Sequence, residues 1–300
     1  MPITKILFIT LSNIGDVIMT TPVLEALHQT YPEAVIDIVG DARSDIVFKH
    51  CPYRGELFLK DKKKGWRGTL SLICQLRKKR YDIAVDLRSD GLLYLISAKQ
   101  KYFKLSNQSS MNMHSVEKHF AAIQAITPLS PTVRTKIWLS DQEMASAEQW
   151  LAGVNNQRIL ALGLGANFLG KIWPVSHFQD LANALASQFD QVLLVGNQQD
   201  ATLSAQFMQA CKLPVIDCCG KLDLLTTAAL LARASYFVGN DSGLGHIASA
   251  VGTPTFTVFG VGQPNRYRPW GEKALWYQDP QREIAAVNPH YVADMIKQVL

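Results

Sequence analysis

Short apolar runs of strand length alternate with amphipathic stretches of helix length along most of the chain. Apolar runs of about four to eight residues are typical of buried strands, and apolar residues three and four apart are typical of helices that cover a sheet. In the first half, strands are predicted at residues 6–10, 34–39, 56–59 and 82–86, and helices at 17–31, 44–49, 70–79 and 116–126. Such alternation predicts an α/β fold with a parallel sheet covered on both faces.

The alternation resumes in the second half after an interruption. Residues 127–131, Thr-Pro-Leu-Ser-Pro, break the helical pattern. A helix at 142–151 then precedes a second series of strands, at 159–164, 191–195, 215–217, 236–238 and 255–259. We therefore expect two domains, residues 1–150 and 151–300, with a last helix at 291–300 that could pack back across the first domain.

The composition is that of a soluble globular enzyme, with 48% hydrophobic and 18% charged residues. The longest apolar candidate for a membrane span, residues 247–262, is interrupted by Gly252 and Pro254, and the N-terminus lacks the pattern of a signal peptide. Five cysteines, an odd number without the spacing of a metal site, indicate reduced thiols. We therefore expect a cytoplasmic protein.

Positive charge is concentrated in the first half of the chain. Residues 1–150 hold 20 Lys and Arg and 15 Asp and Glu, whereas residues 151–300 hold 10 of each. Residues 60–80 contain nine basic residues and one acid, Asp61. Such a run is either a solvated helix face and loop or a surface that attracts an anionic membrane or a phosphorylated acceptor. Within it Gly65-Trp66-Arg67-Gly68 places an aromatic side chain between two flexible points, which suits a mobile loop.

A polar turn between two apolar runs carries the clearest candidate chemistry. Residues 239–248 read Gly-Asn-Asp-Ser-Gly-Leu-Gly-His-Ile-Ala, which predicts a strand, a tight turn and a helix that opens at Ser242 and Gly243. The first amides of a helix have no intrahelical partners and carry partial positive charge, so the turn suits a phosphate group. Asp241 and His246 flank those amides. On its residues alone, the segment is equally well an N-capped helix of an α/β core.

Two further strand–turn–helix segments carry a candidate acid and a candidate cation. Asp16 follows the first strand and a glycine turn, and the carboxyl ends of parallel strands are where α/β sheets bind ligands. Alternatively Asp16 only caps the next helix, in which Pro22 makes a kink or takes the first position after a Thr21 cap. Lys171 lies in a glycine-rich loop after the strand at 159–164, where a compact, flexible cation suits a phosphate. For any single lysine, a solvated surface position is the commoner explanation.

Together these segments resemble glycosyltransferase family 9, the lipopolysaccharide heptosyltransferases. The resemblance runs in the family's order from about residue 6 to residue 259. The matching residues are Gly15-Asp16-Val17 with Thr20-Thr21-Pro22-Val23-Leu24, His114-Ser115-Val116-Glu117-Lys118-His119, Gly165-Ala166 with Lys171, Trp173 and Pro174, and Asn240-Asp241-Ser242-Gly243 with His246. The resemblance implies two Rossmann-like domains facing a cleft, the GT-B arrangement. It also implies metal-independent, inverting transfer of a sugar, most often heptose from ADP-heptose, to a lipopolysaccharide core acceptor.

The resemblance assigns the reaction itself to a small set of groups. Asp16 would be the general base that takes the proton of the acceptor hydroxyl. Many glycosyltransferases hold the donor diphosphate through a metal bound by an Asp-x-Asp pair, and this chain contains no such pair. Lys171 and the backbone amides of Ser242, Gly243 and Leu244 would then neutralise the diphosphate without a metal or other cofactor.

The remaining candidates would hold the two substrates. Asp241 would contact the donor sugar, and His246 could orient the loop, touch the phosphate or be structural. Asn167, Asn197 and Gln198 would face the nucleotide, although family members often carry an acid where Asn197 and Gln198 stand. The basic residues that would contact the acceptor are Lys60, Lys62, Lys63, Lys64, Arg67 and Arg88.

The expected partners are a nucleotide-sugar donor, an anionic lipid-linked saccharide and the cytoplasmic face of the inner membrane, where the protein would be peripheral; nucleic acid is not expected. Three alternatives remain open: another nucleotide sugar as donor, a non-catalytic nucleotide-sugar binding protein, and an NAD-dependent oxidoreductase. The last is disfavoured because the segment Gly163-x-Gly165-x-x-Phe168 lacks the third glycine of the dinucleotide fingerprint, and the chain has no Tyr-x-x-x-Lys pair.

Overall fold

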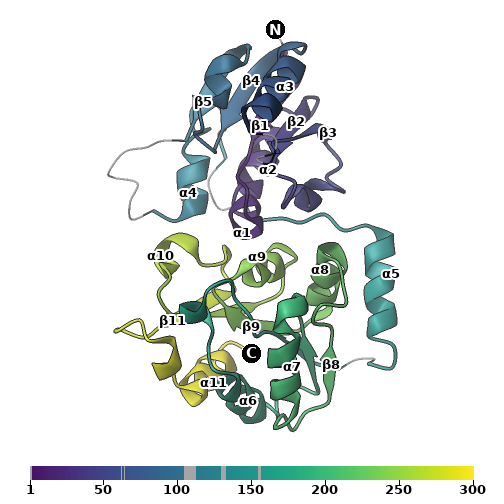
Figure 1. Ribbon diagram of the computed structural model, residues 1–300, viewed down its shortest axis with the longest axis vertical. Coiled ribbons are helices and arrows are strands. Elements are labelled where there is room, and N and C mark those ends of the chain that lie inside the picture. Colours follow the sequence, from purple (N-terminus) through teal and green to yellow (C-terminus); the bar gives the residue numbers. More distant parts are fainter. Residues whose placement is uncertain (1, 62, 64, 105–112, 130–132, 155–156) are drawn as a thin grey trace. The chain divides into compact units, whose positions relative to one another are not determined.

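The chain folds into two compact units, Met1–Trp138 and Leu139–Leu300. The structure is a computed structural model that describes residues 2–61, 63, 65–104, 113–129, 133–154 and 157–300 (Figure 1). The division between the units therefore lies before the boundary near residue 150 that the sequence pattern predicted. The reason is helix α5 (Asp141–Trp150), which starts at a capping box of Ser140 and Glu143 and packs against helix α8 (Leu224–Arg233) of the second unit.

The first unit is built on a five-stranded parallel sheet in the order β3-β2-β1-β4-β5. Its strands are β1 (Lys5–Ile9), β2 (Val35–Gly40), β3 (Arg54–Leu59), β4 (Tyr81–Asp86) and β5 (Ala98–Phe103). Its helices are α1 (Ile14–Ile18), α2 (Thr21–Thr30), α3 (Gly65–Arg77) and α4 (Ser115–Phe120), with short 3-10 turns η1 (Asp45–Phe48) and η3 (Leu92–Leu95). The central strands β1 and β4 are almost wholly buried, and their residues are apolar apart from Lys5, Asp82 and Asp86.

The second unit carries a six-stranded parallel sheet in the order β11-β10-β9-β6-β7-β8. Its strands are β6 (Ile159–Gly163), β7 (Gln191–Leu194), β8 (Val215–Asp217), β9 (Tyr236–Asn240), β10 (Thr255–Phe259) and β11 (Ala274–Gln278). Besides α5 and α8, its helices are α6 (Val175–Ala184), α7 (Ala201–Met208), α9 (Gly243–Ala250), α10 (Pro264–Tyr267) and α11 (Pro289–Lys297), with 3-10 turns η5 (Leu169–Lys171), η6 (Gln198–Asp200) and η7 (Ile284–Ala286). The predicted α/β class with two parallel sheets is confirmed.

Several of the predicted helices have different limits in the structure; the one expected over 116–126, for example, ends at Phe120 as α4. The single helix expected over 17–31 is two helices, α1 and α2, and Pro22 lies in the first turn of α2 after a Thr20 cap. Asp16 is inside the first turn of α1, so it is not the cap, which is Asn13. The expected mobile loop around Trp66 is the first turn of α3. Burial of Leu72, Ile73 and Leu76 on the sheet outweighs the cost of two glycines in that turn, about 1 kcal/mol each.

The sequence pattern missed the strand β5. β5 carries exposed Lys99, Gln100 and Lys101 and lies at the edge of its sheet, where charged residues replace the apolar pattern of a buried strand. The terminal helix α11 buries Val292, Ala293 and Ile296 in the core of the second unit, together with side chains of α6. Its apolar face is therefore used within its own unit.

The helices of the described residues are all too short or too polar to cross a membrane.

A buried histidine is expected to make the first unit sensitive to acid. His119 lies on α4 with 1% of its surface exposed. Burial, together with the positive charge of Lys104, His114 and Lys118, lowers the pKa of His119 to about 3. Because the unfolded chain binds a proton near pH 6.5 and the folded protein does not, the stabilising contribution of neutral His119 is complete above about pH 6.5. It is lost as the pH falls from there towards 3.

We predict that lowering the pH from 7 to 5 reduces the free energy of unfolding by about 2 kcal/mol through this group, since each pH unit below the unfolded pKa is worth about 1.4 kcal/mol. Urea unfolding at both pH values measures it. The substitution His119→Leu should shrink the difference by that amount, and His290→Leu, at an exposed position, is the control. A His119→Leu protein with the pH dependence of the wild type would contradict the assignment.

Candidate active site

The second unit gathers polar groups at the place where its strand order reverses. Strand β6 pairs with β7 on one side and with β9 on the other. The connections after β6 and β9 therefore leave in opposite directions, and such a crevice at the carboxyl ends of parallel strands is where open α/β sheets bind ligands. The loop of residues 164–174 follows β6, and the turn of residues 241–242 follows β9.

One buried amide joins these two connections. Asn240, the last residue of β9, is fully buried. Its Nδ2 donates to the carbonyl oxygens of Leu164 at 2.8 Å and Gly165 at 3.4 Å, and its Oδ1 accepts from the backbone N–H of Trp173 at 3.0 Å. The indole of Trp173 is itself fully buried and donates to the carbonyl of Val287 at 3.0 Å. Both ends of the loop that carries Lys171 are thus held to β9.

The lysine and the acid predicted for the donor site meet in the structure. The Nζ of Lys171 lies 2.6 Å from the Oδ2 of Asp241, and the two side chains are 26% and 12% exposed. Asp241 is followed by Ser242, which precedes the first turn of α9 and does not cap it with its side chain. The amides at the start of α9 are therefore available beside a partly exposed cation. His246 is buried further along the same helix.

Two glycines allow loops to approach closely around this pair. A Cβ on Gly260, which follows β10, would lie 2.2 Å from the carbonyl oxygen of Gly170. A Cβ on Gly165 would lie 1.8 Å from the Oδ1 of Asp200. Any larger residue at either position would displace the loop before Lys171 or the carboxylate of Asp200.

Asp200 is a further candidate that the sequence analysis overlooked. Its Oδ2 accepts from the backbone N–H of Asn197 at 2.8 Å and completes a capping box at the end of β7. The side chain of Asn197 accepts from Gln199 N–H within the same turn. An acid is therefore present in the loop where only Asn197 and Gln198 were considered. The pattern that could have revealed it is a strand, a glycine and an acid four residues after the glycine.

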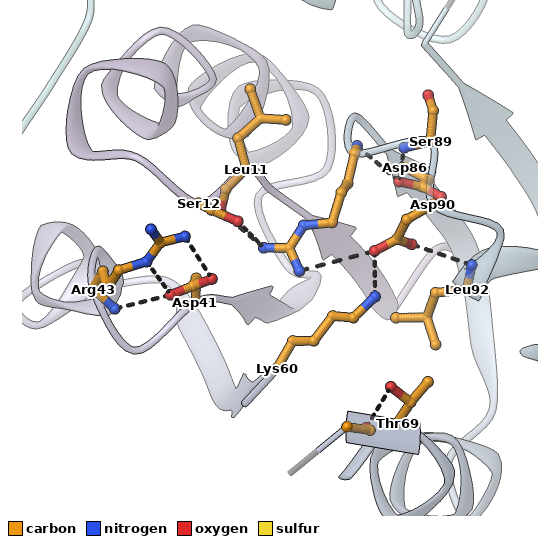
Figure 2. A network of polar contacts seen from close by, with 12 residues as sticks. Leu11, Ser12, Asp41, Arg43, Lys60, Thr69, Asp86, Ser89, Asp90 and Leu92 are labelled. Atoms are coloured by element: carbon orange, nitrogen blue, oxygen red, sulfur yellow. Dashed lines mark hydrogen bonds and ion pairs between the residues drawn. The ribbon is translucent and has the colours of Figure 1, made fainter. Parts of the chain in front are cut away.

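In the first unit, a polar network joins the loops at the carboxyl ends of the strands (Figure 2). Arg88, after β4, is nine-tenths buried, and its Nη2 donates to the carbonyl of Leu11 at 3.0 Å and to the hydroxyl of Ser12 at 3.2 Å, both after β1. Asp90 lies 4.0 Å from the Nη1 of Arg88 and forms an ion pair with Lys60, which follows β3. Strands β1 and β4 flank the point where the order of this sheet reverses.

Two more carboxylates lie at the same edge of the sheet. Asp41, after β2, accepts two hydrogen bonds from the guanidinium of Arg43, and these bonds with one from Ser12 lower the pKa of Asp41 to about 2. Asp86 is fully buried at the end of β4 and accepts from the backbone N–H groups of residues 88 and 89 at 2.8 and 3.0 Å. Burial raises the pKa of Asp86. The acids that follow β2 and β4 were not singled out from the sequence.

Asp16 follows Leu11 and Ser12, the two network residues after β1, by a few positions in the sequence. It is half-buried in the first turn of α1, and its Oδ2 accepts from the Nδ2 of Asn13 at 3.0 Å. Since Arg88 holds Leu11 and Ser12, the segment that leads to Asp16 is tied to β4. The carboxylate therefore has a defined backbone position and an exposed amide as its hydrogen-bond partner.

The basic residues predicted for the acceptor separate into two groups. Lys60 and Arg88 belong to the network at the edge of the sheet. Lys63 and Arg67 are exposed before and within the first turn of α3, whereas Lys62 and Lys64 lie outside the described residues. Over the part of the chain that the structure describes, His, Cys, Asp and Glu side chains form no group of three that could hold a metal ion.

Comparison with known proteins gives a consistent result. The model of the family described as glycosyltransferase family 9 (heptosyltransferase) matches residues 91–288. Lipopolysaccharide heptosyltransferase 3 of Escherichia coli K12 is 27% identical over 292 residues, which cover 88% of this chain and 84% of the relative.

Two solved structures share the fold. A glycosyl transferase of family 9 from Veillonella parvula superposes with a TM-score of 0.88 at 19% identity, covering 100% of this chain and 98% of the other. The E. coli heptosyltransferase WaaC with ADP-2-deoxy-2-fluoro heptose superposes with a TM-score of 0.76 at 20% identity, covering 99% of this chain and 100% of the other.

We predict that Asn240→Leu lowers the free energy of unfolding by about 2–5 kcal/mol, because it leaves the N–H of Trp173 and the carbonyl of Leu164 buried without partners, at about 1–3 kcal/mol each. Urea unfolding measures the loss. Asn183→Leu is the matched control: its amide also donates and accepts, to Ala210 and from Lys212, but at exposed positions where water replaces it. It should cost less than about 1 kcal/mol. Equal losses in the two variants would argue against the role of Asn240.

Proposed function

The chain belongs to glycosyltransferase family 9, and on this premise we propose that it transfers heptose from ADP-heptose to the core saccharide of a lipopolysaccharide. Membership of the family makes it a glycosyltransferase. The named activity of the E. coli relative and the ADP-heptose analogue of WaaC support the choice of sugar and acceptor. The observation that carries the proposal is the ion pair of Lys171 and Asp241 beside the start of α9.

A nucleotide sugar fits this place because its diphosphate needs a cation and backbone amides. Its sugar hydroxyls need a hydrogen-bond acceptor within a few ångströms of them. Lys171 and the amides of Ser242, Gly243 and Leu244 would bind the two phosphates. When the donor binds, the ion pair between Asp241 and Lys171 would weaken, and Asp241 would accept hydrogen bonds from hydroxyls of the sugar. The pair thus keeps the lysine in position before the donor arrives, since an unpaired, partly buried cation is costly.

The nucleotide would lie over the neighbouring loops of the same sheet. Asn167, Asn197 and Gln198 remain our candidates for it, and Asp200 joins them as the acid of that loop. The Oδ1 of Asn197 already accepts from Gln199 in its own turn, so its Nδ2 is the group left for a ligand. His246, buried on α9, would hold the helix that presents the amides.

The reaction then needs one base and one stabilised leaving group. The carboxylate of Asp16 takes the proton of the acceptor hydroxyl as that oxygen attacks the anomeric carbon. The bond from this carbon to the diphosphate breaks, and ADP leaves with the electron pair. Attack from the side opposite ADP inverts the configuration. Lys171 and the amides of α9 offset the charge that develops on the diphosphate, so no metal enters the scheme.

The first unit would bind the acceptor. An anionic core saccharide suits Lys60, Lys63 and Arg67, and we extend the proposal to Lys62 and Lys64 of the same run. Arg88 is too buried to offer most of its guanidinium to a saccharide, and its hydrogen bonds go to the segment before Asp16. We therefore assign Arg88 to positioning that segment. A lipid-linked acceptor would place the protein at the cytoplasmic face of the inner membrane as a peripheral protein.

The test of this function is incubation with a panel of nucleotide sugars and a deacylated lipopolysaccharide core, followed by mass spectrometry. We expect the acceptor to gain one heptose from ADP-heptose, with or without excess EDTA, because the diphosphate is bound by Lys171 and amides. Transfer only from another nucleotide sugar would overturn the donor. Loss of activity in EDTA that magnesium or manganese restores would overturn the metal-free scheme. Donor binding without any turnover would favour a binding protein.

We predict that Asp16→Asn lowers kcat by about 10²–10⁴-fold, as expected for loss of a general base, with donor affinity unchanged. Steady-state kinetics with the deacylated acceptor and calorimetric titration of ADP measure the two quantities. Asp45→Asn is the matched control, because Asp45 also lies in the first turn of a short helix of the same unit but outside the network. A folded Asp16→Asn enzyme with normal turnover would remove Asp16 from the mechanism.

A further inference from the structure

Helix α3 exposes large apolar side chains along one flank. Trp66 is 68% exposed and Leu70 is 50% exposed. They are four residues apart, so they lie one above the other on the helix, and Arg77, eleven residues after Trp66, continues the same row. The adjacent face of α3 buries Leu72 and Leu76 in the core of the unit. The exposed row therefore borders the buried stripe and is not needed for packing.

A second exposed apolar pair lies beside this row. The Nε of Arg77 donates to the carbonyl of Leu95 at 2.8 Å, which sets the end of the row against the turn η3. In η3, Tyr94 is 74% exposed and Leu95 is 47% exposed. Tyr94 stacks on Phe103 of β5 with ring centroids 4.9 Å apart, which fixes its ring at the surface. We call Trp66, Leu70, Tyr94 and Leu95 the docking face; α3 and β5 are labelled in Figure 1.

Positive charge is concentrated in the segment that carries the docking face. Residues 60–104 contain thirteen Lys and Arg and four Asp and Glu. Three of these acids are engaged inside the unit: Asp82 with Lys99, Asp86 in the core, and Asp90 with Lys60. The basic residues Arg67, Lys78 and Arg80, in contrast, are exposed on or just after α3. The guanidinium of Arg67 also lies 5.6 Å from the ring centre of Trp66.

This combination identifies one kind of partner. Tryptophan and tyrosine prefer the zone between lipid headgroups and acyl chains, leucine prefers the acyl chains, and Lys and Arg prefer anionic headgroups. A soluble phosphosaccharide would need the charges but not an exposed row of apolar side chains. Single exposed apolar residues are ordinary on a protein surface, but four on two adjoining elements are not.

We propose that the first unit docks on anionic phospholipid membranes through the docking face. The proposal deepens the proposed function, which places the acceptor in a membrane, but it stands on the surface itself. Docking would insert Trp66, Leu70, Tyr94 and Leu95 among the headgroups and set the cations of this segment against the phosphates. The same unit carries Asp16 and the loops assigned to the acceptor, so docking would bring them to the membrane surface.

The test is co-sedimentation of the full chain with vesicles of phosphatidylcholine, with and without phosphatidylglycerol, and with no substrate present. The wild type should bind the mixed vesicles better than the neutral ones, and added salt should weaken that preference. The variant Trp66→Ala, Leu70→Ser, Tyr94→Ser should lower the partition coefficient at least about tenfold on both kinds of vesicle. Trp150→Ala with Met208→Ser, at exposed apolar positions of the second unit, is the matched control and should bind as the wild type.

Charge is tested separately from insertion. Lys78→Gln with Arg80→Gln should reduce the gain from phosphatidylglycerol by about 25-fold at low salt, since each cation near an anionic surface contributes about fivefold. The triple apolar variant should keep normal transfer to the deacylated acceptor, which shows that it is folded. Equal vesicle binding by the triple variant and its control, or no vesicle binding by the wild type, would overturn the proposal. Either result would leave the transferase assignment intact, because transferase activity is measured separately on soluble substrates.

Discussion

The arrangement of the proposed donor site depends on one buried carboxamide. Asn240 satisfies three backbone groups at the point where the second sheet changes direction: two carbonyls after β6 and the N–H of Trp173. A parallel sheet ends in loops whose backbone groups have no strand partners, and each such group left unpaired in the interior is costly. One side chain with two donors and an acceptor meets this requirement. Lys171 and Asp241 are both close in sequence to groups in these hydrogen bonds. Lys171 stands two residues before Trp173, and Asp241 directly follows Asn240.

In the first unit a charged side chain, Arg88, joins two strand ends in the same way. Arg88 ties β4 to the segment after β1, as Asn240 ties β9 to the loop after β6. Its guanidinium is surrounded by Asp90, Asp41 and Asp86, so a buried cation is balanced by acids at the ends of neighbouring strands. In both units the side chain that we assign to chemistry, Asp16 or Asp241, follows directly after a tied segment. The proposed base and the proposed phosphate ligands therefore start from defined positions, which reduces the reorganisation needed in the reaction.

The sequence alone predicted the parts that short-range physics determines. Short strands such as the half-buried β8 and the fully buried β10 were placed residue for residue, and the glycine turn before α9 was placed from its caps. The edge strand β5 escaped because its exposed lysines hide the strand pattern, and the start of α3 escaped because two glycines resemble a loop. Lys171 and Asp241, seventy residues apart, were assigned to one donor site only through the family resemblance, and their ion pair was not predicted. Asp200 was missed because its approach to Gly165 is a property of the folded sheet.

The central claim is that the loops held by Asn240 form the diphosphate site. A crystal structure of the protein with ADP tests this most directly. The account predicts that the diphosphate lies within hydrogen-bond distance of the Nζ of Lys171 and of the amides of Gly243 and Leu244, with the contact between Lys171 and Asp241 lengthened or shared. An ADP molecule whose phosphates lie away from Lys171 and the start of α9, with that ion pair unchanged, would contradict it.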